Sequence, residues 1–330
     1  MKTSFPTDLH GYAAPEWRKH LRQPGRLAFT LTELLVLLCL VALLGCLTLS
    51  ATSLSTSTSQ TVQCLENIRE LTRAWTLYAV DNQGWLAPNT DNGEYGNWLG
   101  GSMDGAGSYN DPTNRALLVN RYPGAKAPGL QAPSAIGNYI VDWKVCKCPA
   151  DFSWWNPTNA FNEVGIGTGK GPRVRSYSMN GAVGTQWTEK IAVTGPWLTA
   201  SYGANRPGNP YNTYGTLNSF TNPGPANTFV IVDEDPYSIN DAVLSVSCNL
   251  PDQFIDHPAV FHDNGAVFSF ADGHVILKHW ADPRTLYVET EKYHPGGNGG
   301  PNNPDIDWLR LRTSAYGNGQ PMPLSVPPSP

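Results

Sequence analysis

The chain has 330 residues, a net charge of −5 at pH 7 and 15% charged side chains, with 32 glycines and 28 prolines. Residues 1–28 hold five basic and two acidic side chains, a net charge of +3, so the remaining residues carry −8. An acidic remainder argues against nucleic-acid binding through a basic patch. The richness in glycine and proline is typical of a loop-rich domain outside the cytoplasm, and argues against a compact helical enzyme.

The first feature in chain order is an apolar stretch of 21 residues from Phe29 to Leu49, in which Glu33 is the only charged residue. A helix of about 20 apolar residues crosses the core of a bilayer. Basic residues that flank such a span stay on the cytoplasmic side. We therefore expect a cytoplasmic leader at 1–28 and a single transmembrane segment at 29–49 in the inner membrane. The rest of the chain is then periplasmic or extracellular.

This N-terminus resembles that of type IV prepilins and of pseudopilins of type II secretion. The resemblance rests on a basic leader, a phenylalanine at Phe29 and a glutamate four residues later at Glu33. It implies cleavage after Ala28, where the family usually has glycine, by a prepilin peptidase that also methylates the new amino terminus of Phe29. It also implies assembly with other pilin or pseudopilin subunits. An intramembrane carboxylate needs a cationic partner, and the amino terminus of Phe29, in the same or a neighbouring subunit, fits that need.

Two other interpretations of the N-terminus stay open. The apolar stretch is also compatible with an ordinary signal anchor in which Glu33 has no special role. The residues Leu43–Cys46 resemble a lipoprotein cleavage box, and a lipidated Cys46 would replace the helix as the membrane anchor.

A long helix is expected to continue beyond the membrane. Residues 50–60 contain no glycine or proline, and apolar side chains then recur at helical spacing. The pattern predicts one helix over about 29–82, with Gly84 as its stop. The residues on its apolar face are Leu65, Ile68, Leu71, Trp75 and Tyr78. We predict an α+β, pilin-like fold: this helix (29–84), packed on a loop-rich head with an antiparallel β-sheet (85–295), and a flexible tail (296–330).

The head is expected to contain short strands separated by long loops. Strand candidates are Tyr139–Val145, Arg173–Met179, Lys190–Val193, Thr228–Val232, Ala242–Val246 and Ala259–His262. Asp272-Gly273 between two apolar runs predicts a hairpin of Ala266–Phe270 with Val275–Trp280. In this hairpin Phe270 would face Val275 and Phe268 would face Leu277. The many tryptophans and tyrosines either fix the loops to the core or stack on sugars. Within the tail, a short amphipathic segment lies near Trp308.

The C-terminal part carries a second resemblance. His262, nine further residues and then Asp272-Gly273 match the ending of a bacterial prepilin-like family that is described by this spacing. Further strings that match are Cys64–Asn67, Cys148–Asp151, Ser176–Asn180 and Asp233-Glu234. The resemblance implies a filament-type protein and does not assign an activity.

Cysteines and carboxylates give separate site hypotheses. One or two disulfides are favoured over a metal site, with free thiols as the alternative, for the four cysteines outside the membrane segment: Cys64, Cys146, Cys148 and Cys248. The pair Cys146 and Cys148 is only a weak metal signal, because no second cysteine pair accompanies it. Hard oxygen ligands suit calcium, which some pseudopilin heads bind, and the candidates are Asp233, Glu234 and Asp241. Together with Asp235, His262, Asp272 and His274 they are also the candidates for a metal or acid–base site.

The sequence therefore predicts a prepilin-like subunit of a type IV pilus or a type II secretion pseudopilus. A minor subunit is favoured over a major one. It predicts no enzyme activity, and no cofactor other than calcium. The first alternative is a membrane-anchored module that binds polysaccharide and is exported by a pilin signal. The second is a metal-dependent hydrolase on the same anchor, although the chain has no nucleophile elbow and no His-Glu-x-x-His motif.

Overall fold

The computed structural model describes most of the head and the long helix from Leu31 onward. Of residues 44–56 and 164–165 it describes the backbone alone, and Ala28 and Phe29 lie outside the described residues. The chain divides into two compact units, Met1–Thr52 and Ser53–Pro330. The described residues are 30–91, 95–104, 110–120, 133–155, 164–165, 171–186, 189–200, 209–286 and 299–324.

The long helix is present as α1, Leu31–Asp81. It ends as the sequence predicts, because Gly84 has a φ of +86° and its N–H donates to the carbonyl of Ala79 at 2.7 Å. Within the described part of the chain, no helix contains an apolar stretch of the length that crossing a bilayer requires. The expected span at 29–49 falls partly outside that description, since it includes Phe29 and the side chains of residues 44–49.

In the second unit, one face of α1 forms the spine of the head. Ile68, Leu71 and Trp75 are fully buried, and Leu65 and Tyr78 pack at the border of the same cluster. The apolar face that the spacing predicts is therefore confirmed. Helical spacing carries this information because residues three and four apart lie on the same side of a helix.

The main sheet has five strands in the order β6-β4-β5-β7-β8. Their bounds are β4 Tyr177–Asn180, β5 Phe229–Asp233, β6 Val243–Leu244, β7 Gly265–Phe270 and β8 Val275–His279. The sheet is mixed, because β6 pairs with β4 in parallel while the other pairs are antiparallel. This corrects the predicted antiparallel sheet. A second small sheet has the order β2-β1-β3, with β1 Trp154–Trp155, β2 Val164–Gly165 and β3 Gly171–Pro172.

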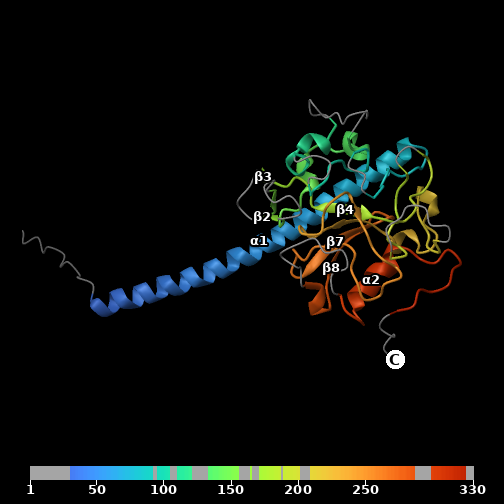
Figure 1. Cartoon of the computed structure of the whole chain (residues 1–330). Helices are drawn as coiled ribbons and strands as arrows, with labels where there is room; N and C mark the ends of the chain where they lie inside the picture. The colour runs from blue at the N-terminus through green and yellow to red at the C-terminus, as the bar shows by residue number, and fades with distance from the viewer. Residues whose placement is uncertain are drawn as a thin grey trace, which may run out of the picture. The chain divides into compact units, whose positions relative to one another are not determined.

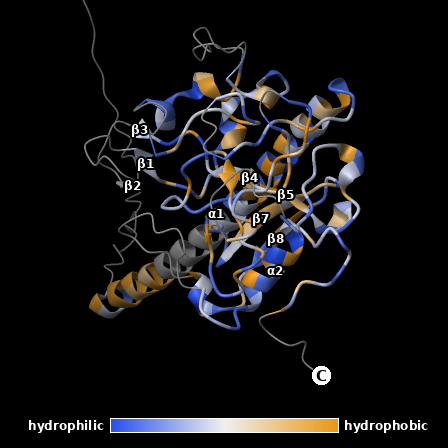
Figure 2. Cartoon of the chain, turned by 45° about the vertical axis from the view of Figure 1, so that its right-hand side comes forward, coloured by the Kyte–Doolittle hydropathy of each residue, from blue (hydrophilic) through white to orange (hydrophobic). Residues whose placement is uncertain are grey.

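The residues of the sheet contribute to two apolar clusters. Figure 1 shows α1 and α2 beside the sheet, and Figure 2 marks the hydrophobic residues along the ribbon. Val267 of β7 belongs to the cluster with α1, whereas Phe268 and Phe270 belong to the cluster with helix α2, Pro304–Thr313. The head is thus a helix–sheet–helix arrangement. The amphipathic segment expected near Trp308 is part of α2, and this helix corrects the prediction of a flexible tail for the described residues 299–324. The helix begins at Asn303, whose side chain accepts from the N–H of Asp305 at 2.9 Å.

Several predicted strands are shorter or absent. Tyr139–Val145 is not a strand: the 3₁₀ turns Ala135–Asn138 and Trp143–Cys146 occupy this region, and the Asp142 carboxylate accepts from the N–H of Lys144. A side chain that bonds its own backbone in this way competes with a sheet ladder. Arg173–Met179 becomes a strand only from Tyr177, and Ala242–Val246 only at Val243–Leu244. Lys190–Val193 and Ala259–His262 form no strand.

The predicted hairpin of β7 and β8 is present, but its register differs by one residue. Ser269 faces Val275 and Phe268 faces Ile276. The N–H of Phe270 donates to the carbonyl of His274, so the loop itself is the three residues 271–273. The N–H of Gly273 donates to the carbonyl of Phe270, and within the loop only Gly273 has a positive φ, +92°. The prediction assumed a two-residue turn with two positive φ angles, whereas a type I turn followed by a left-handed glycine adds one residue.

Gly273→Ala is expected to lower the free energy of unfolding by about 1–2 kcal/mol, because an L side chain at this positive φ is strained. The added methyl group meets nothing within 4 Å, so the loss reports the backbone conformation alone. Gly224→Ala is the matched control: its φ is −68° and its Cβ also meets nothing. Urea denaturation of both variants checks this, and equal midpoints would contradict it.

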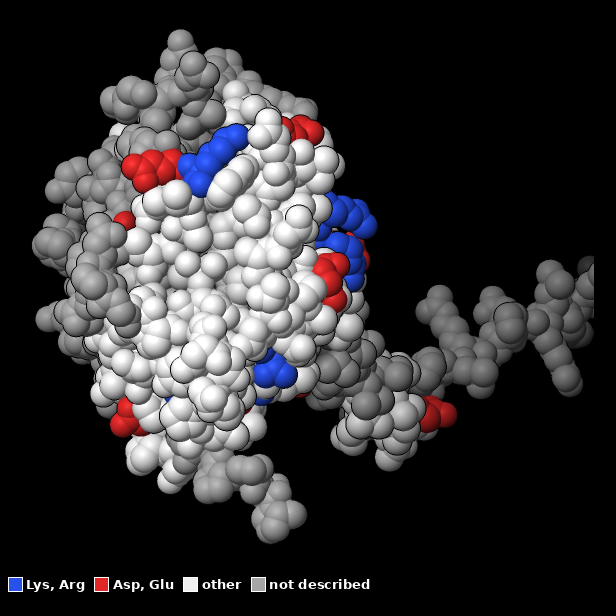
Figure 3. All heavy atoms as spheres, turned by 90° about the vertical axis from the view of Figure 1, so that its right-hand side faces the viewer, with Lys and Arg blue, Asp and Glu red and all other residues white. Residues whose placement is uncertain are grey.

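The surface of the head is sparsely charged. On the face in Figure 3, side chains of Lys, Arg, Asp and Glu lie scattered among uncharged ones, and both signs occur. This distribution follows from the low charged fraction of the sequence, 15%.

Candidate metal centre

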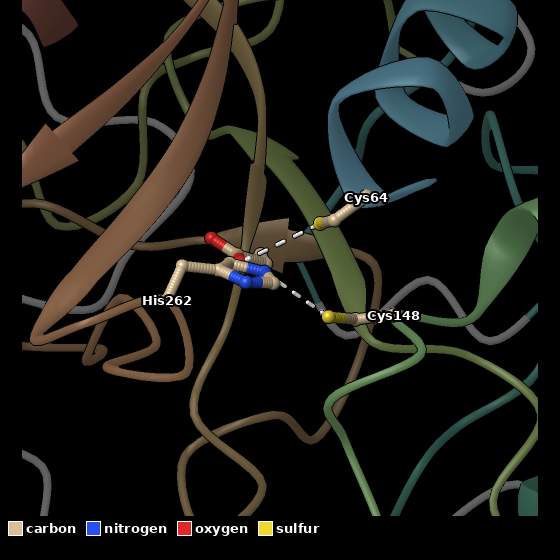
Figure 4. Close-up of side chains that lie close together, drawn as sticks. Cys64, Cys148 and His262 are labelled. Atoms are coloured by element: carbon tan, nitrogen blue, oxygen red, sulfur yellow. Dashed lines mark hydrogen bonds and ion pairs between the residues drawn. The ribbon is translucent and has the colours of Figure 1, made fainter. Parts of the chain in front are cut away.

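Four side chains that are distant in sequence meet under α1. Cys64, Cys148, Asp233 and His262 each offer one ligand atom, and these atoms all lie within 4.8 Å of one another. The Nε2 atom of His262 is 3.3 Å from Sγ of Cys148 and 3.3 Å from Oδ2 of Asp233. The same Oδ2 is 3.8 Å from Sγ of Cys64. Figure 4 shows the thiols of Cys64 and Cys148 and the ring of His262 converging on one point.

Each of the four residues comes from a different part of the head. Cys64 lies on the buried face of α1, and Cys148 lies in the loop after the 3₁₀ turn Trp143–Cys146. Asp233 ends β5, and His262 precedes β7. The most exposed of the four side chains, His262, has 1% of its surface accessible. The cluster is therefore closed to solvent and ties the helix to the sheet.

Hydrogen bonds orient His262 and Asp233 toward the centre. The hydroxyl of Thr61 donates to the carbonyl of Ser57 at 3.0 Å, so its oxygen accepts from Nδ1–H of His262 at 3.2 Å. Oδ1 of Asp233 accepts from the N–H of Val267 at 2.7 Å. Nε2 of His262 and Oδ2 of Asp233 are thus the atoms that face the thiols.

A second set of bonds fixes the loop that carries Cys148. The hydroxyl of Ser176 donates to the Asp151 carboxylate at 2.6 Å and accepts from the N–H of Cys148 at 3.1 Å. From the helix, the amide of Asn67 donates to the carbonyl of Lys147 at 3.0 Å, and that of Gln60 to the carbonyl of Pro149 at 3.2 Å. The loop is held on both sides, so the thiol of Cys148 has a defined position.

The charges at the cluster favour a cation. Burial raises the pKa of Cys64 and the pKa of Asp233. Burial alone would also raise the pKa of Cys148, but hydrogen bonds with Cys64 and His262 outweigh it and lower that pKa. Burial disfavours the imidazolium of His262, yet its bonds to Asp233 and Cys148 raise its pKa to about 10. The Asp233 carboxylate and the Cys148 thiol therefore favour a positive charge at the centre, either a proton on His262 or a metal ion.

The structure combines residues that the sequence analysis treated separately. Cys64 and Cys148, which were disulfide candidates, lie beside Asp233, a calcium candidate, and His262 of the family motif. Cys146 and Cys248 are buried elsewhere, and burial raises the pKa of each thiol, that of Cys248 to about 12. All four cysteines are free thiols in the structure.

The other residues of the calcium hypothesis lie outside the cluster. Glu234 accepts from the hydroxyl of Ser238 at 2.8 Å, and Asp241 accepts from the N–H of Val243 at 2.8 Å. Among the residues with described placement, only Asp233 of the three candidates enters the group of ligand atoms.

Asp272 also has a structural role. Its carboxylate accepts from the N–H of His274 at 3.1 Å and contacts Nδ1 of the same residue at 2.6 Å, which closes the hairpin loop. Asp272 and His274 therefore do not join His262 in one site.

Glu33 has a local partner that the sequence analysis overlooked. Its carboxylate accepts from the N–H of Thr30 at 2.9 Å and from the Thr30 hydroxyl at 2.8 Å, while the N–H of Glu33 donates back to that hydroxyl at 3.2 Å. This is a capping box at the start of α1, and the pattern Thr-x-x-Glu signals it in the sequence.

Comparison of the chain with protein-family models, with curated proteins and with solved structures gives no match. The two resemblances in the sequence therefore remain hypotheses. The structure adds one observation to the second resemblance: its scattered strings meet in space. Each of these strings provides either a side chain of the cluster or a hydrogen bond that supports it: Cys64–Asn67, Cys148–Asp151, Ser176–Asn180, Asp233 and His262.

Proposed function

We propose that the chain is a prepilin-like subunit of a type IV pilus or a type II secretion pseudopilus, and a minor subunit in preference to a major one. In this proposal a prepilin peptidase cleaves after Ala28 and methylates Phe29, and the subunit assembles with other pilins or pseudopilins from the inner membrane. The observation that carries the proposal is the composition of α1. Its first part is apolar on all sides, and its last part is the spine of an α+β head.

The first part of α1 needs a partner that covers it. Five consecutive apolar residues there have between 47% and 60% of their surface accessible in the isolated chain: Leu34, Leu35, Val36, Leu37 and Leu38. A helix that is apolar all round is stable only when lipid or other helices surround it. Membrane lipid before assembly, and the helices of neighbouring subunits after it, would cover this segment.

The capping box gives Glu33 a second role within the proposal. In the unprocessed chain its carboxylate binds Thr30 and stabilises the first turn of the helix. After cleavage, the ammonium group of Phe29 would be next to Thr30 in sequence. The carboxylate is then near a positive charge of its own chain, and a neighbouring subunit can provide or receive the same interaction.

The two alternatives receive less support from the described residues. Trp75, Trp98, Trp155 and Trp280 are buried, and no tryptophan with described placement is fully exposed. These rings fix loops to the core rather than line a groove for sugars. The cluster under α1 is equally unsuited to a hydrolase, since none of its four side chains is more than 1% accessible.

We expect Glu33→Gln to retain cleavage but to reduce the assembled fraction about tenfold, the effect of losing about 1.4 kcal/mol of charge interaction. The glutamine keeps the capping hydrogen bonds, so the variant isolates the charge. The measurement is intact mass and N-terminal sequencing after co-expression with a prepilin peptidase, together with the filament fraction in sheared material. Thr32→Val is the matched control next to Glu33 and leaves the charge unchanged.

The N-terminus of the wild-type chain after co-expression with the peptidase tests the proposed function itself. A chain that begins at N-methyl-Phe29 is the expected product. An uncleaved chain, or one that begins at a lipidated Cys46, would overturn the filament proposal and favour the membrane-anchored binding module.

A further inference from the structure

We propose that the head of this protein holds a structural Zn²⁺ ion bound by Cys64, Cys148, Asp233 and His262. The ligand atoms are the two Sγ atoms, Oδ2 of Asp233 and Nε2 of His262. This inference goes beyond the proposed filament function, and it does not depend on cleavage or assembly.

The spacing of the ligand atoms fits a tetrahedral ion. With usual zinc–sulfur, zinc–nitrogen and zinc–oxygen bonds, neighbouring ligands of a tetrahedron lie about 3.3–3.8 Å apart. His262 and Asp233 are separated by 3.3 Å, His262 and Cys148 by 3.3 Å, and Asp233 and Cys64 by 3.8 Å. The remaining pairs lie within 4.8 Å, so shifts of about 1 Å in side-chain position suffice to complete the tetrahedron.

Hydrogen bonds from neighbouring groups hold the ligand side chains in the orientation that a metal needs. A zinc-bound histidine usually donates its other ring N–H to an oxygen, which fixes the tautomer. Nδ1 of His262 has this bond to Thr61, so Nε2 can present its lone pair to the ion. Asp233 is held in the same way through Oδ1 by the N–H of Val267. The hydroxyl of Tyr177 lies 3.4 Å from Sγ of Cys64 and can donate to its thiolate.

The donor set selects the metal. Two thiolates and an imidazole suit zinc, whereas calcium requires six to eight oxygen ligands. Binding releases the two thiol protons, and any proton on Nε2 of His262, to solvent. The Zn²⁺ ion then offsets two of the three negative charges of the two thiolates and the carboxylate, which would repel one another in a buried site without it.

The site is structural rather than catalytic. Four protein ligands leave no open position for water or substrate, and all four side chains are buried. The ion would join α1, the loop of Cys148, the end of β5 and the segment before β7. Because an unfolded chain has no such preformed site, metal binding contributes directly to folding of the head. It would also keep Cys64 and Cys148 from pairing as a disulfide outside the cytoplasm.

The first test is the metal content of the full-length wild-type chain, purified in detergent without chelators from zinc-supplemented cells. Mass spectrometry of the elements should find about one zinc per chain, as a single four-ligand site requires. Cobalt exchanged into the site should show the visible absorption of a tetrahedral thiolate complex. A zinc-free chain with reduced thiols would overturn the proposal, and so would a zinc-free chain lighter by two hydrogens with a Cys64–Cys148 disulfide. Both of these results come from the wild-type chain, so the test does not depend on whether a variant folds.

Variants then assign the ligands. Cys148→Ser should lower the bound zinc by at least about tenfold, while Cys146→Ser, two residues away and outside the cluster, should keep it. Thr61→Val leaves all four ligands in place but removes the acceptor for Nδ1–H of His262. It should weaken zinc affinity about 10- to 100-fold, measured by competition with a chromogenic chelator. Equal zinc loss in Cys146→Ser and Cys148→Ser would overturn this ligand assignment.

The zinc test and the processing test are separable. A chain that is cleaved and methylated but binds no zinc refutes only the metal centre. A chain that binds zinc but is not cleaved after Ala28 refutes only the filament function.

Discussion

Arg175→Met is expected to lower the free energy of unfolding by about 3–5 kcal/mol, because it leaves several buried carbonyl groups without a donor. The guanidinium of Arg175 is fully buried and donates to the carbonyls of Tyr177, Asp241 and Gly101 at 3.0, 2.8 and 3.0 Å. Burial lowers its pKa to about 10, so the group stays charged at neutral pH. Methionine fills a similar volume and donates no hydrogen bond.

The effect of Arg175→Met is measured by urea denaturation of the full chain in detergent, followed by circular dichroism. Arg69→Met is the matched control. Arg69 forms an ion pair with Glu66 at the surface of α1, and removing such a pair costs about 0–1 kcal/mol. A wild-type midpoint for Arg175→Met would show that the guanidinium does not hold these loops together.

Trp75→Ala is expected to cost about 3–5 kcal/mol through the cavity that it leaves in the core. Trp75 is fully buried on α1, and its ring meets that of Phe220 edge to face with centroids 6.3 Å apart. The change keeps a good helix former in the helix, so the loss reports packing rather than helix propensity. Circular dichroism in urea gives the free energy here as well.

Two further variants separate the causes of the Trp75 effect. Leu77→Ala lies two residues away on the same helix with 52% of its surface exposed, and it should change stability by no more than about 0.5 kcal/mol. Trp75→Phe should cost less than Trp75→Ala, because Nε1 of Trp75 has no hydrogen-bond partner among the described residues. Equal losses for Trp75→Ala and Leu77→Ala would contradict the assignment of the buried face.

Elements with strong local signals were predictable from the sequence. The helical spacing of Ile68, Leu71 and Trp75 predicted both α1 and its buried face, and Gly84 predicted its end. Strand β5 and the hairpin of β7 and β8 were predicted from apolar runs and turn residues. Local patterns could not fix the register of that hairpin, since it depends on whether one or two turn residues adopt a positive φ.

Other elements were predicted only in part, or not at all, although the sequence contained signals for them. An amphipathic segment was predicted near Trp308, but not the full extent of the helix that contains it. Helix α2 has Asn303 at its N-cap, Pro304 at its first position and basic residues in its last turn. The surrounding glycines, asparagines and prolines are instead typical of a flexible segment. In the same way the capping box of Thr30 and Glu33 was overlooked in favour of the apolar stretch.

The candidate metal centre could be predicted only in pieces. Each of its residues stood in a string that the sequence analysis had singled out, but Cys64 and His262 are 198 positions apart. Ligands this distant meet only through tertiary packing, in this case of α1 against the sheet. Assigning the thiols to disulfides and the carboxylates to calcium kept apart donors that the fold brings together.

The edge strands of the main sheet affect whether neighbouring heads can pair through their sheets at high local concentration. At one edge β6 is only two residues long. At the other edge β8 carries Lys278, whose ammonium group lies 3.0 Å from the carboxylate of Asp305 in α2. Short edges and charged edge residues hinder the addition of a strand from another chain. Many copies can therefore lie side by side without fusing their sheets into an aggregate. In a filament of the proposed kind, cohesion between subunits would come from the apolar helices.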